Sequence, residues 1–321
     1  MQQTRAKGIE PPTVGSEDRC SIQLSYARGW RSVPRRFLLG KATVILIREK
    51  CYLSRAVRSE IMGIMAGKRG LVTGVLHETS IATAIAQSLL REGAECLFTH
   101  LPGDKMERRT RKIAESLGVT SPWLQPMDVG NDADITACFD RIGRDFETID
   151  FVVHCIAYAD KEWLKLGKFA ATPRAVFANA LDISAFSYMA LGNAAVPVLK
   201  DGGSIIGLSY YGAEKAVPGY NVMGVAKAAL EASNRYLAME LGRVKNIRCN
   251  LVSAGPIKTL SSSAVGGFDA ILERIPQAAP LPRNIVSAEV GDASLFLLSD
   301  LSRGTTGQVL YVDSGYSIMG L

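Results

Sequence analysis

Residues 69–90 read RGLVTGVLHETSIATAIAQSLL, a stretch in which a predicted strand runs through a turn into a predicted helix. Strands and helices go on alternating along the rest of the chain, as a parallel sheet with crossover helices requires. The sequence predicts seven strands, at 69–74, 95–99, 122–126, 150–154, 203–208, 246–252 and 308–312. We therefore expect residues 65–321 to form a single α/β domain, a doubly wound Rossmann-type fold whose seven-stranded parallel sheet has helices on both faces.

The turn after the first strand is where such a fold receives a dinucleotide. Gly74 ends the strand, but the later glycines of the usual fingerprint are absent, and Ser80 and Ala82 supply small side chains instead. The backbone N–H groups at Ser80 and Ile81, together with the helix dipole, suit a pyrophosphate. A serine at a helix start is also an ordinary N-cap, so this motif alone does not establish a cofactor site.

Two tyrosines and a lysine stand out in residues 209–232, SYYGAEKAVPGYNVMGVAKAALEA. From Val222 onward, apolar residues at helical spacing predict a helix that begins close to Tyr220. Lys227 then lies on the same face as Tyr220, roughly 10 Å along the axis, which leaves room for a sugar. A phenol so placed can stabilise a developing oxyanion, and an ammonium can hold a cofactor ribose and favour the ionised phenol. The alternative is that Tyr210 and Tyr220 are packing aromatics and Lys227 is a solvated charge.

The spacing resembles that of the enoyl-acyl-carrier-protein reductases of bacterial fatty-acid synthesis, a divergent branch of the short-chain dehydrogenase/reductase superfamily. Ordinary members of the superfamily have the lysine four residues after the tyrosine, a position held here by Gly224. This chain instead has Tyr-x6-Lys and a further tyrosine ten residues upstream. The resemblance extends from about Met65 to Leu321 and is carried by GKRGLVTGV, Asp128-Val129, HCIAYADK, YNVMGVAKAALEASNRYLA, SAGPIKTL, SDLSRGTTGQ and VDSGY.

This resemblance implies reduction of the trans-2 double bond of an enoyl thioester on acyl carrier protein, with NADH as the cofactor. It implies three catalytic residues: Tyr220 stabilises the enolate, Lys227 holds the cofactor ribose, and Tyr210 orients the thioester or relays a proton. Cofactor contacts are implied for Gly74, Ser80, Ile81, Asp128, Val129, Cys155, Ile156, Ala157, Lys227, Ile257 and Thr259. In the resemblance, Asp128 and Val129 lie at the adenine, and residues 155–157 border the nicotinamide ribose. Ile257 binds the nicotinamide carboxamide, and Thr259 lies near the pyrophosphate. Substrate contacts are implied for Ala159, Tyr210, Tyr220, Phe268 and Ile271, with residues 259–273 forming a mobile wall over the acyl chain.

The resemblance also implies a homotetramer with twofold symmetry in a bacterial cytoplasm. The helix that carries Lys227 has a second line of small or apolar side chains, Ala228, Ala232, Leu237 and Met239. These cannot all pack on one sheet, so we expect another helix to cover them. The strand at 308–312 is expected to take part in the same assembly.

The chain departs from the family at two places. Leu101, after the second strand, stands where the family often has glutamine, and no acidic residue for the ribose hydroxyls or arginine for a 2′-phosphate accompanies it. NADH follows from the family trend, while Lys105 and Arg108 leave NADPH open. The wall lacks the basic residues with which some relatives meet the carrier protein, and has Gly266, Gly267, Asp269 and Ala270 instead.

Other interpretations of the same residues remain open. A reductase of another carbonyl or enoyl substrate would use the same scaffold, since a fold does not fix a substrate. A relative that binds NAD without turnover is a third hypothesis, and the joint presence of both tyrosines and the lysine argues against it. Asp128 also suits a strand-ending turn. Cys155 and His154 are expected to be a small buried thiol and a packing imidazole rather than a nucleophile and a base.

Charge and composition exclude several classes of protein. Residues 1–64 carry 12 Lys and Arg against 5 Asp and Glu, whereas the remainder carries 25 against 26, so we expect no basic surface for nucleic acid on the domain. The longest apolar runs, ATVILI and LFLL, are far too short to span a membrane. Six scattered cysteines without a C-x-x-C pair and three dispersed histidines indicate free thiols in a reducing compartment and no metal site.

Residues 1–64 are expected to be an appendage, mostly without regular structure, although 37–57 has the composition of a short helix or strand. An upstream start codon, with Met62 or Met65 as the natural start, accounts for their arginine-rich and irregular composition. A transit peptide is the alternative, since such segments are rich in arginine and poor in acidic residues. Three acidic residues, Glu10, Glu17 and Asp18, argue against it.

Overall fold

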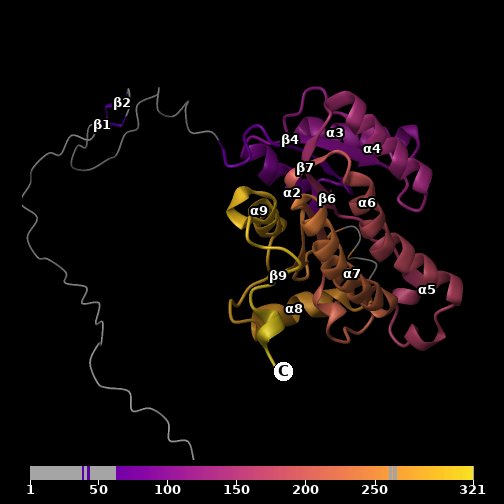
Figure 1. The fold of residues 1–321 in the computed structure, drawn as a ribbon. Coiled ribbons are helices and arrows are strands. Elements are labelled where there is room, and N and C mark those ends of the chain that lie inside the picture. The colour runs from indigo at the N-terminus through magenta and orange to yellow at the C-terminus, as the bar shows by residue number, and fades with distance from the viewer. Residues whose placement is uncertain (1–37, 40–41, 44–62, 260–261, 263–265, 321) are drawn as a thin grey trace, which may run out of the picture. The chain divides into compact units, whose positions relative to one another are not determined.

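The computed structural model describes residues 38–39, 42–43, 63–259, 262 and 266–320 (Figure 1). The chain divides into two units, Met1–Glu60 and Ile61–Leu321. In the first unit the described residues form two short antiparallel strands, β1 (Leu38–Leu39) and β2 (Ala42–Thr43). Apart from these strands and its last two residues, the appendage expected at 1–64 lies outside the described residues.

The second unit is built on one parallel sheet with the strand order β5-β4-β3-β6-β7-β8-β9. The strands are β3 (Arg69–Val72), β4 (Glu95–His100), β5 (Leu124–Pro126), β6 (Ile149–His154), β7 (Leu199–Ser209), β8 (Arg248–Ala254) and β9 (Val309–Val312). Each coincides with a predicted strand apart from a few residues at the ends, so the predicted sheet is confirmed. Because β4 and β6 flank β3, the chain winds outward in both directions from the centre. This doubly wound order places the ligand crevice at the carboxyl ends of β3 and β6.

Helices cover both faces of the sheet. One face packs against α2 (Ile81–Arg91), α3 (Asp104–Ser116) and α9 (Ser287–Leu298), and the other against α4 (Asp132–Phe146), α6 (Ser187–Ala195) and α7 (Asn221–Lys245). Figure 1 shows α9 on one side of the strands, with α6 and α7 on the other. Neighbouring side chains of a strand point to opposite faces, so Val72 enters the first core and Leu71 the second.

The remaining helical elements lie in the connections between strands, except η7, which follows β9. They are α5 (Arg174–Leu181), α8 (Phe268–Ala278), η1 (Lys161–Leu164), η2 (Phe169–Ala171), the π-helical η3 (Asp182–Phe186), η4 (Tyr211–Ala213), η6 (Asp300–Ser302) and η7 (Tyr316–Ile318). A third, smaller apolar cluster lies beside the amino end of α7 and consists of Leu164, Ala180, Val222 and Met223. Tyr220 packs against this cluster, which we call the entrance cluster below.

One helical segment, Arg174–Ala195, is long and apolar enough to cross a membrane by length and composition, with a mean hydropathy of 1.2. It consists of α5, η3 and α6. Core helices of globular domains satisfy the same criteria. Here Tyr188, Leu191 and Ala195 are fully buried in the second core, so this face of the segment packs on the sheet.

Candidate active site

The first strand leads into a turn that only glycine fits. Gly74 has a φ of +82°, and a Cβ atom on it would lie 2.0 Å from the carbonyl oxygen of Cys155. This close approach joins the carboxyl ends of β3 and β6. Thr73 Oγ1 donates there to the Val153 carbonyl (3.0 Å) and accepts from the Cys155 N–H (3.2 Å). The two central strands therefore end side by side at the base of the crevice.

Helix α2 begins at Ile81, as predicted, with Ser80 as its N-cap. Ser80 Oγ accepts a long bond from the Thr83 N–H (3.4 Å), and Thr83 Oγ1 donates to the His77 carbonyl (2.8 Å). The first turn of α2 contains no acidic residue, so no carboxylate of its own offsets the positive end of the helix dipole. Ser80 and Ile81 are half-buried, and this helix end suits an anion such as a pyrophosphate.

His154, the last residue of β6, is a packing residue, as predicted. Its Nε2 lies 2.8 Å from Ser187 Oγ, and its ring meets Tyr188 edge to face. Burial lowers the pKa of His154 to about 3, and the charge of Lys227 acts in the same direction. The imidazole is therefore neutral at physiological pH and cannot serve as a base that cycles its proton.

Exposure increases along the three residues that follow β6. Cys155 and Ile156 are half-buried, and Ala157 is exposed. Burial raises the pKa of the Cys155 thiol to about 11, even though Lys227 opposes this effect. The thiol is therefore protonated, which agrees with the interpretation of Cys155 as a small packing residue. The contacts of these three residues with a nicotinamide ribose stay a prediction.

Lys227 is only 5% exposed, so the alternative of a solvated helix charge is wrong. Its Nζ donates to the Leu208 carbonyl near the end of β7, at 2.6 Å. Burial lowers the pKa of Lys227 to about 8, against the opposing effects of Cys155 and Glu231. At pH 7 the side chain is still mostly an ammonium, fixed by a backbone acceptor at the carboxyl end of a central strand.

The rings of Tyr210 and Tyr220 meet edge to face, with centroids 4.8 Å apart. Burial raises the pKa of Tyr210 to about 12, and it also raises the pKa of Tyr220 above its ordinary value. The loss of solvation therefore dominates the pKa of Tyr220 in this structure, and the expectation that Lys227 favours the ionised phenol stays a prediction. Both hydroxyls keep their protons at neutral pH, which suits hydrogen-bond donors.

Two glycines explain why the lysine follows the tyrosine by seven residues instead of four. A Cβ atom on Gly224 would lie 2.7 Å from the Gly212 carbonyl oxygen, and one on Gly212 would lie 2.5 Å from the ring of Tyr220. The turn η4 therefore packs directly on the first turns of α7. A lysine at position 224 has no room there, whereas Lys227 faces β7. The Tyr-x6-Lys spacing thus has a steric cause.

Two carboxylates that the sequence analysis missed hold the chain on either side of η4, one at the end of β7 and one directly after η4. Glu231 is 8% exposed and accepts from Ser209 Oγ (2.5 Å), and burial raises its pKa. Glu214 accepts from the Tyr311 hydroxyl on β9 (2.6 Å). The sequence does contain a signal for Glu231, because it follows Lys227 by four residues and so lies on the same helix face. The hydrogen bond of Glu214 joins positions 97 residues apart, so no local sequence pattern predicts it.

Asp128 and Val129, predicted to contact adenine, follow β5. Asp128 Oδ1 accepts from the Gly130 N–H (2.9 Å), and the Asp128 N–H donates to Asp134 Oδ2 (2.9 Å). Val129 is buried in the second core. The strand-ending turn that Asp128 also suits is therefore present, and the contact with adenine stays a prediction.

The loop after β8 holds two further predicted cofactor residues, Ile257 and Thr259. Gly255 attaches its start to β9, because its N–H donates to the Val312 carbonyl (2.7 Å). Ser262 Oγ donates to the Ile257 carbonyl (2.8 Å) and accepts from the Thr259 N–H (2.8 Å). Ile257 packs half-buried against the first core. Contacts of this loop with a nicotinamide and a pyrophosphate stay a prediction.

Of the predicted substrate residues, Ala159 packs with Tyr220 against the entrance cluster. Phe268 begins α8, Ile271 lies one turn further, and both are half-buried. The Gly266 N–H donates to the carbonyl of Leu164, a member of the entrance cluster, at 3.0 Å. The start of α8 is therefore attached beside Tyr220. Residues 260–261 and 263–265 of the predicted mobile wall lie outside the described residues.

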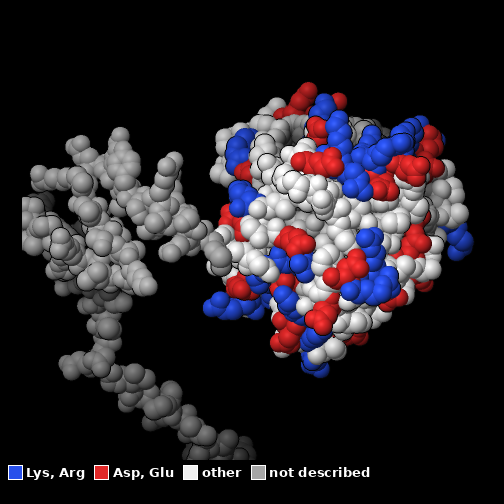
Figure 2. Space-filling view, turned by 90° about the horizontal axis from the view of Figure 1, so that it is seen from above, with Lys and Arg blue, Asp and Glu red and all other residues white. Residues whose placement is uncertain are grey.

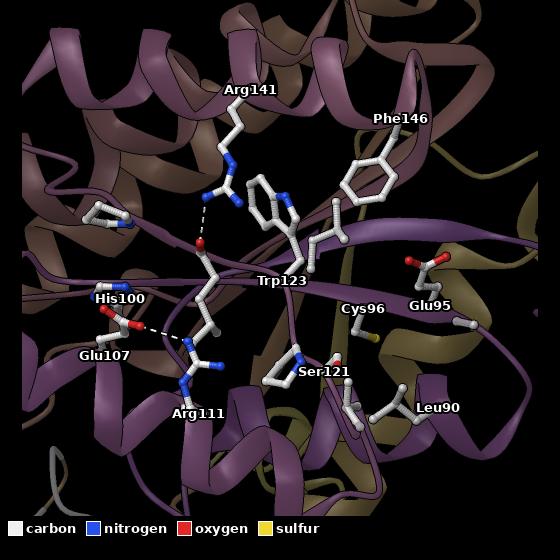
Figure 3. Close-up of a pocket in the computed structure, with 16 residues that line it drawn as sticks. Leu90, Glu95, Cys96, His100, Glu107, Arg111, Ser121, Trp123, Arg141 and Phe146 are labelled. Atoms are coloured by element: carbon white, nitrogen blue, oxygen red, sulfur yellow. Dashed lines mark hydrogen bonds and ion pairs between the residues drawn. The ribbon is translucent and has the colours of Figure 1, made fainter.

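A cavity of about 860 Å³ lies away from these residues, between α3, α4 and the β5 edge of the sheet (Figure 3). Its two arginines already have partners: Arg111 donates to Glu107 (2.7 Å), and Arg141 donates to Gln125 Oε1 (2.9 Å) and stacks on Trp123. Its volume alone does not make it an active site. In the described part of the chain, no group of three or more His, Cys, Asp or Glu side chains is arranged to hold a metal ion.

Comparisons with known proteins agree with this geometry. A family model described as enoyl-(acyl carrier protein) reductase matches residues 74–317. The chain is 51% identical over 258 residues to the NADH-dependent enoyl-acyl-carrier-protein reductase of Nostoc sp., a match that covers 80% of this chain and 99% of the relative.

Two solved structures are also similar. The Bacillus cereus enoyl-acyl carrier protein reductase with NADP+ and indole naphthyridinone has a TM-score of 0.78 at 48% identity, covering 81% of this chain and 100% of that chain. The Anaplasma phagocytophilum reductase in complex with NAD has a TM-score of 0.75 at 42% identity, covering 81% and 95%. Because the family model matches residues 74–317, most of the chain, this chain belongs to the enoyl-(acyl carrier protein) reductase family.

Proposed function

We propose that this chain reduces the trans-2 double bond of enoyl thioesters carried on acyl carrier protein, with NADH as the reductant. One observation carries the proposal: Tyr220, the N-cap of α7, packs against Tyr210, and the buried Lys227 of the same helix binds the Leu208 carbonyl near the carboxyl end of β7. Relatives at 45–51% identity are named as NADH-dependent reductases of this substrate.

The residues at the crevice fit a dinucleotide. The first turn of α2 offers N–H groups and an unopposed dipole for the pyrophosphate. One of the three N–H donors of Lys227 binds the Leu208 carbonyl, which leaves donors for ribose hydroxyls. When bound, the nicotinamide supplies a hydride for the β-carbon of the substrate.

Tyr220 is the donor that stabilises the developing negative charge. As the β-carbon is reduced, charge accumulates on the thioester oxygen, and the Tyr220 hydroxyl donates a hydrogen bond to that atom. Because burial raises its pKa, Tyr220 enters the reaction with its proton in place. Tyr210 holds the Tyr220 ring edge-on, and we assign it to orienting the thioester or relaying the proton that the α-carbon receives.

The preference for NADH is supported by the end of β4. Leu101 there is exposed and uncharged. The basic residues that follow, Lys105 and Arg108, lie on α3, and within the described residues neither side chain forms a hydrogen bond or ion pair that directs it toward the crevice. The ratio of kcat/KM for NADH to that for NADPH measures this preference, and a ratio below one contradicts it.

We also propose a homotetramer, supported by exposed apolar side chains on the helices that cover the second core. Phe186 in η3 and Met189 in α6 are exposed, as are Tyr236 and Met239 in α7. Isolated exposed apolar residues are common, but a series of them along adjacent helices suits a subunit interface. Light scattering that gives a monomer contradicts this assembly.

One part of the predicted interface is wrong. Leu237 is buried within its own chain, where its side chain lies close to Gly192 of α6. The absence of a side chain on Gly192 lets α6 and α7 approach, and Leu237 fills the space between them. Ala228 and Met239 are exposed, and Ala232 is half-buried, so these three remain available to a partner.

We propose a cytoplasmic location as well. Its support is that the four cysteines among the described residues, Cys96, Cys138, Cys155 and Cys249, are free thiols. Free thiols are typical of reducing compartments. Fractionation of cells that express the chain tests this location.

NADH oxidation tests the proposed reaction. We expect turnover with crotonyl thioesters of acyl carrier protein and of coenzyme A, and little turnover with a 3-ketoacyl thioester on the same carriers. Preference for the 3-ketoacyl substrate would assign the chain to carbonyl reduction, and binding of NADH without any turnover would assign it to the non-catalytic relatives.

A further inference from the structure

The connection between β6 and α5 carries exposed lysines beside exposed apolar side chains. Lys161, Lys165 and Lys168 are all exposed, as are Leu166 (63%) and Phe169 (48%). Exposed apolar side chains with polar and charged residues around them are typical of surfaces that bind another protein. We call residues 161–169 the lysine loop.

Hydrogen bonds hold the lysine loop next to the catalytic tyrosine. Asn221, which directly follows Tyr220, donates through its side-chain amide to the carbonyls of Trp163 (2.7 Å) and Lys165 (2.8 Å). Leu164 is buried in the entrance cluster, against which Tyr220 packs. The backbone of the loop is therefore fixed, while its lysine side chains point to solvent.

The lysine loop also touches the predicted substrate wall. The Gly266 N–H donates to the Leu164 carbonyl, and a Cβ atom on Gly266 would lie 3.1 Å from that oxygen. A Cβ atom on Gly219 would in turn lie 2.4 Å from the Gly266 carbonyl oxygen. The loop, the start of α8 and the residue before Tyr220 thus meet at one place, directly beside the proposed catalytic tyrosine.

Positive charge at this place is concentrated on the lysine loop. Lys165 and Lys168 share one carboxylate, Glu162, and Lys161 forms no ion pair within the described residues. On the side of the wall, Lys258 is paired with Asp269 (3.6 Å), so this pair adds no net charge. The net positive charge at this place therefore comes from the lysine loop.

We propose that the lysine loop is the docking surface for the acyl carrier protein, with Lys161, Lys165 and Lys168 facing acidic side chains of the carrier and with Leu166 and Phe169 at the centre of the contact. This inference rests on the proposed function. Because the substrate is tethered to its carrier through the thioester, the carrier has to bind within reach of Tyr220. Complementary charge at that position steers association and fixes orientation.

Reversing the three lysine charges tests the proposal. In the variant Lys161→Glu, Lys165→Glu, Lys168→Glu, we expect KM for crotonyl-acyl carrier protein to rise at least about tenfold. The kcat/KM for crotonyl-pantetheine, which carries the same thioester without an acidic protein, is expected to stay unchanged. The salt dependence of kcat/KM with the carrier protein is expected to decrease, since exposed charge pairs are screened by salt.

A matched control reverses three exposed cations elsewhere, Arg109→Glu, Lys112→Glu and Arg144→Glu on α3 and α4. On that face Lys and Arg are interspersed with Asp and Glu (Figure 2), and we expect no change in KM for the carrier substrate. Activity with crotonyl-pantetheine shows that each variant is folded. If the triple variant loses it, the single variant Lys161→Glu, which breaks no described ion pair, replaces it.

Three results separate the possible errors. An unchanged KM for the carrier substrate in the lysine-loop variant overturns the docking proposal. An equal rise for the carrier and pantetheine substrates also overturns it, because the lysines then act on the pocket. Absence of turnover by the unaltered chain with either crotonyl thioester instead overturns the proposed function on which the inference rests.

Discussion

Replacing Lys227 by methionine is expected to weaken NADH binding and yet stabilise the folded chain at neutral pH. Burial lowers the pKa of Lys227 from 10.5 to about 8. At about 1.4 kcal/mol per pKa unit, keeping this charge inside the fold at pH 7 costs about 3 kcal/mol. Methionine buries no charge, but it gives up the bond to the Leu208 carbonyl, worth about 1.5–3 kcal/mol for a charged donor. We expect a net gain of about 1 kcal/mol in the free energy of unfolding.

The free energy of unfolding is expected to depend on pH differently in the two proteins. Between pH 8 and 10.5 the unfolded lysine keeps its proton while the folded one has lost it, so the unfolded state binds more protons. The free energy of unfolding of the unaltered chain therefore rises with pH in this window, by about 1.4 kcal/mol per pH unit relative to the methionine variant. The advantage of the variant at pH 7 is expected to be reversed near pH 10.

Urea unfolding at pH 7, 8.5 and 10 measures the difference, with both proteins at the same concentration because assembly adds to stability. Lys245→Met is the matched control. Lys245 lies on the same helix and also donates to a backbone carbonyl, that of Val196 (3.1 Å), but it is not fully buried. A difference between the unaltered chain and Lys227→Met that stays constant from pH 7 to 10 would refute the reasoning, because Lys227 would then titrate like an exposed lysine.

The structure supports three further predictions. Tyr220→Phe is expected to lower kcat by about two to three powers of ten, the scale for loss of one oxyanion donor. Tyr211→Phe, a control at a neighbouring tyrosine whose ring packs on Tyr316, is expected to leave kcat nearly unchanged in the same steady-state assay. Near-normal turnover of Tyr220→Phe would assign enolate stabilisation to Tyr210. Gly224→Ala is expected to lower both the melting temperature and kcat, because its Cβ atom would lie 2.7 Å from the Gly212 carbonyl oxygen; thermal melting that matches the unaltered chain would show that η4 moves aside without cost. A chain that starts at Met62 is expected to have the same melting temperature and turnover as the full chain. It keeps the seven-stranded sheet and the close approach of Gly63 to the Glu92 backbone. A lower melting temperature or turnover after truncation would show that residues 1–61 contribute to the fold.

Much of the fold follows from the sequence because its signals are local. Strands buried on both faces appear as apolar runs, and the runs at 69–74 and 150–154 correspond to β3 and β6, between which the crevice lies. The turn at Gly74 can also be predicted from the sequence, because a glycine at the end of a strand indicates a backbone conformation with positive φ. These features depend on neighbours in the chain, so periodicity and composition reveal them.

The parts that the sequence did not reveal depend on packing between distant segments. From the sequence, Leu237 is predicted to lie in a subunit interface. In the structure it is buried against α6, because Gly192 has no side chain and leaves space for it. The pKa of Tyr220 cannot be inferred from its distance to Lys227, because burial decides its direction. The same holds for Glu231, whose partner Ser209 is visible only once β7 and α7 are side by side.

The bond between Tyr311 and Glu214 has a consequence for how the catalytic geometry responds to the molecule's surroundings. β9 is the last strand in the sheet order, so its outer edge is unpaired within this sheet. In the proposed assembly, a subunit that binds along this edge would restrain Tyr311, and through Glu214 it would restrain the turn that begins beside Tyr210. One hydrogen bond would then connect a subunit contact with the position of a proposed catalytic phenol, although every proposed catalytic side chain comes from a single chain.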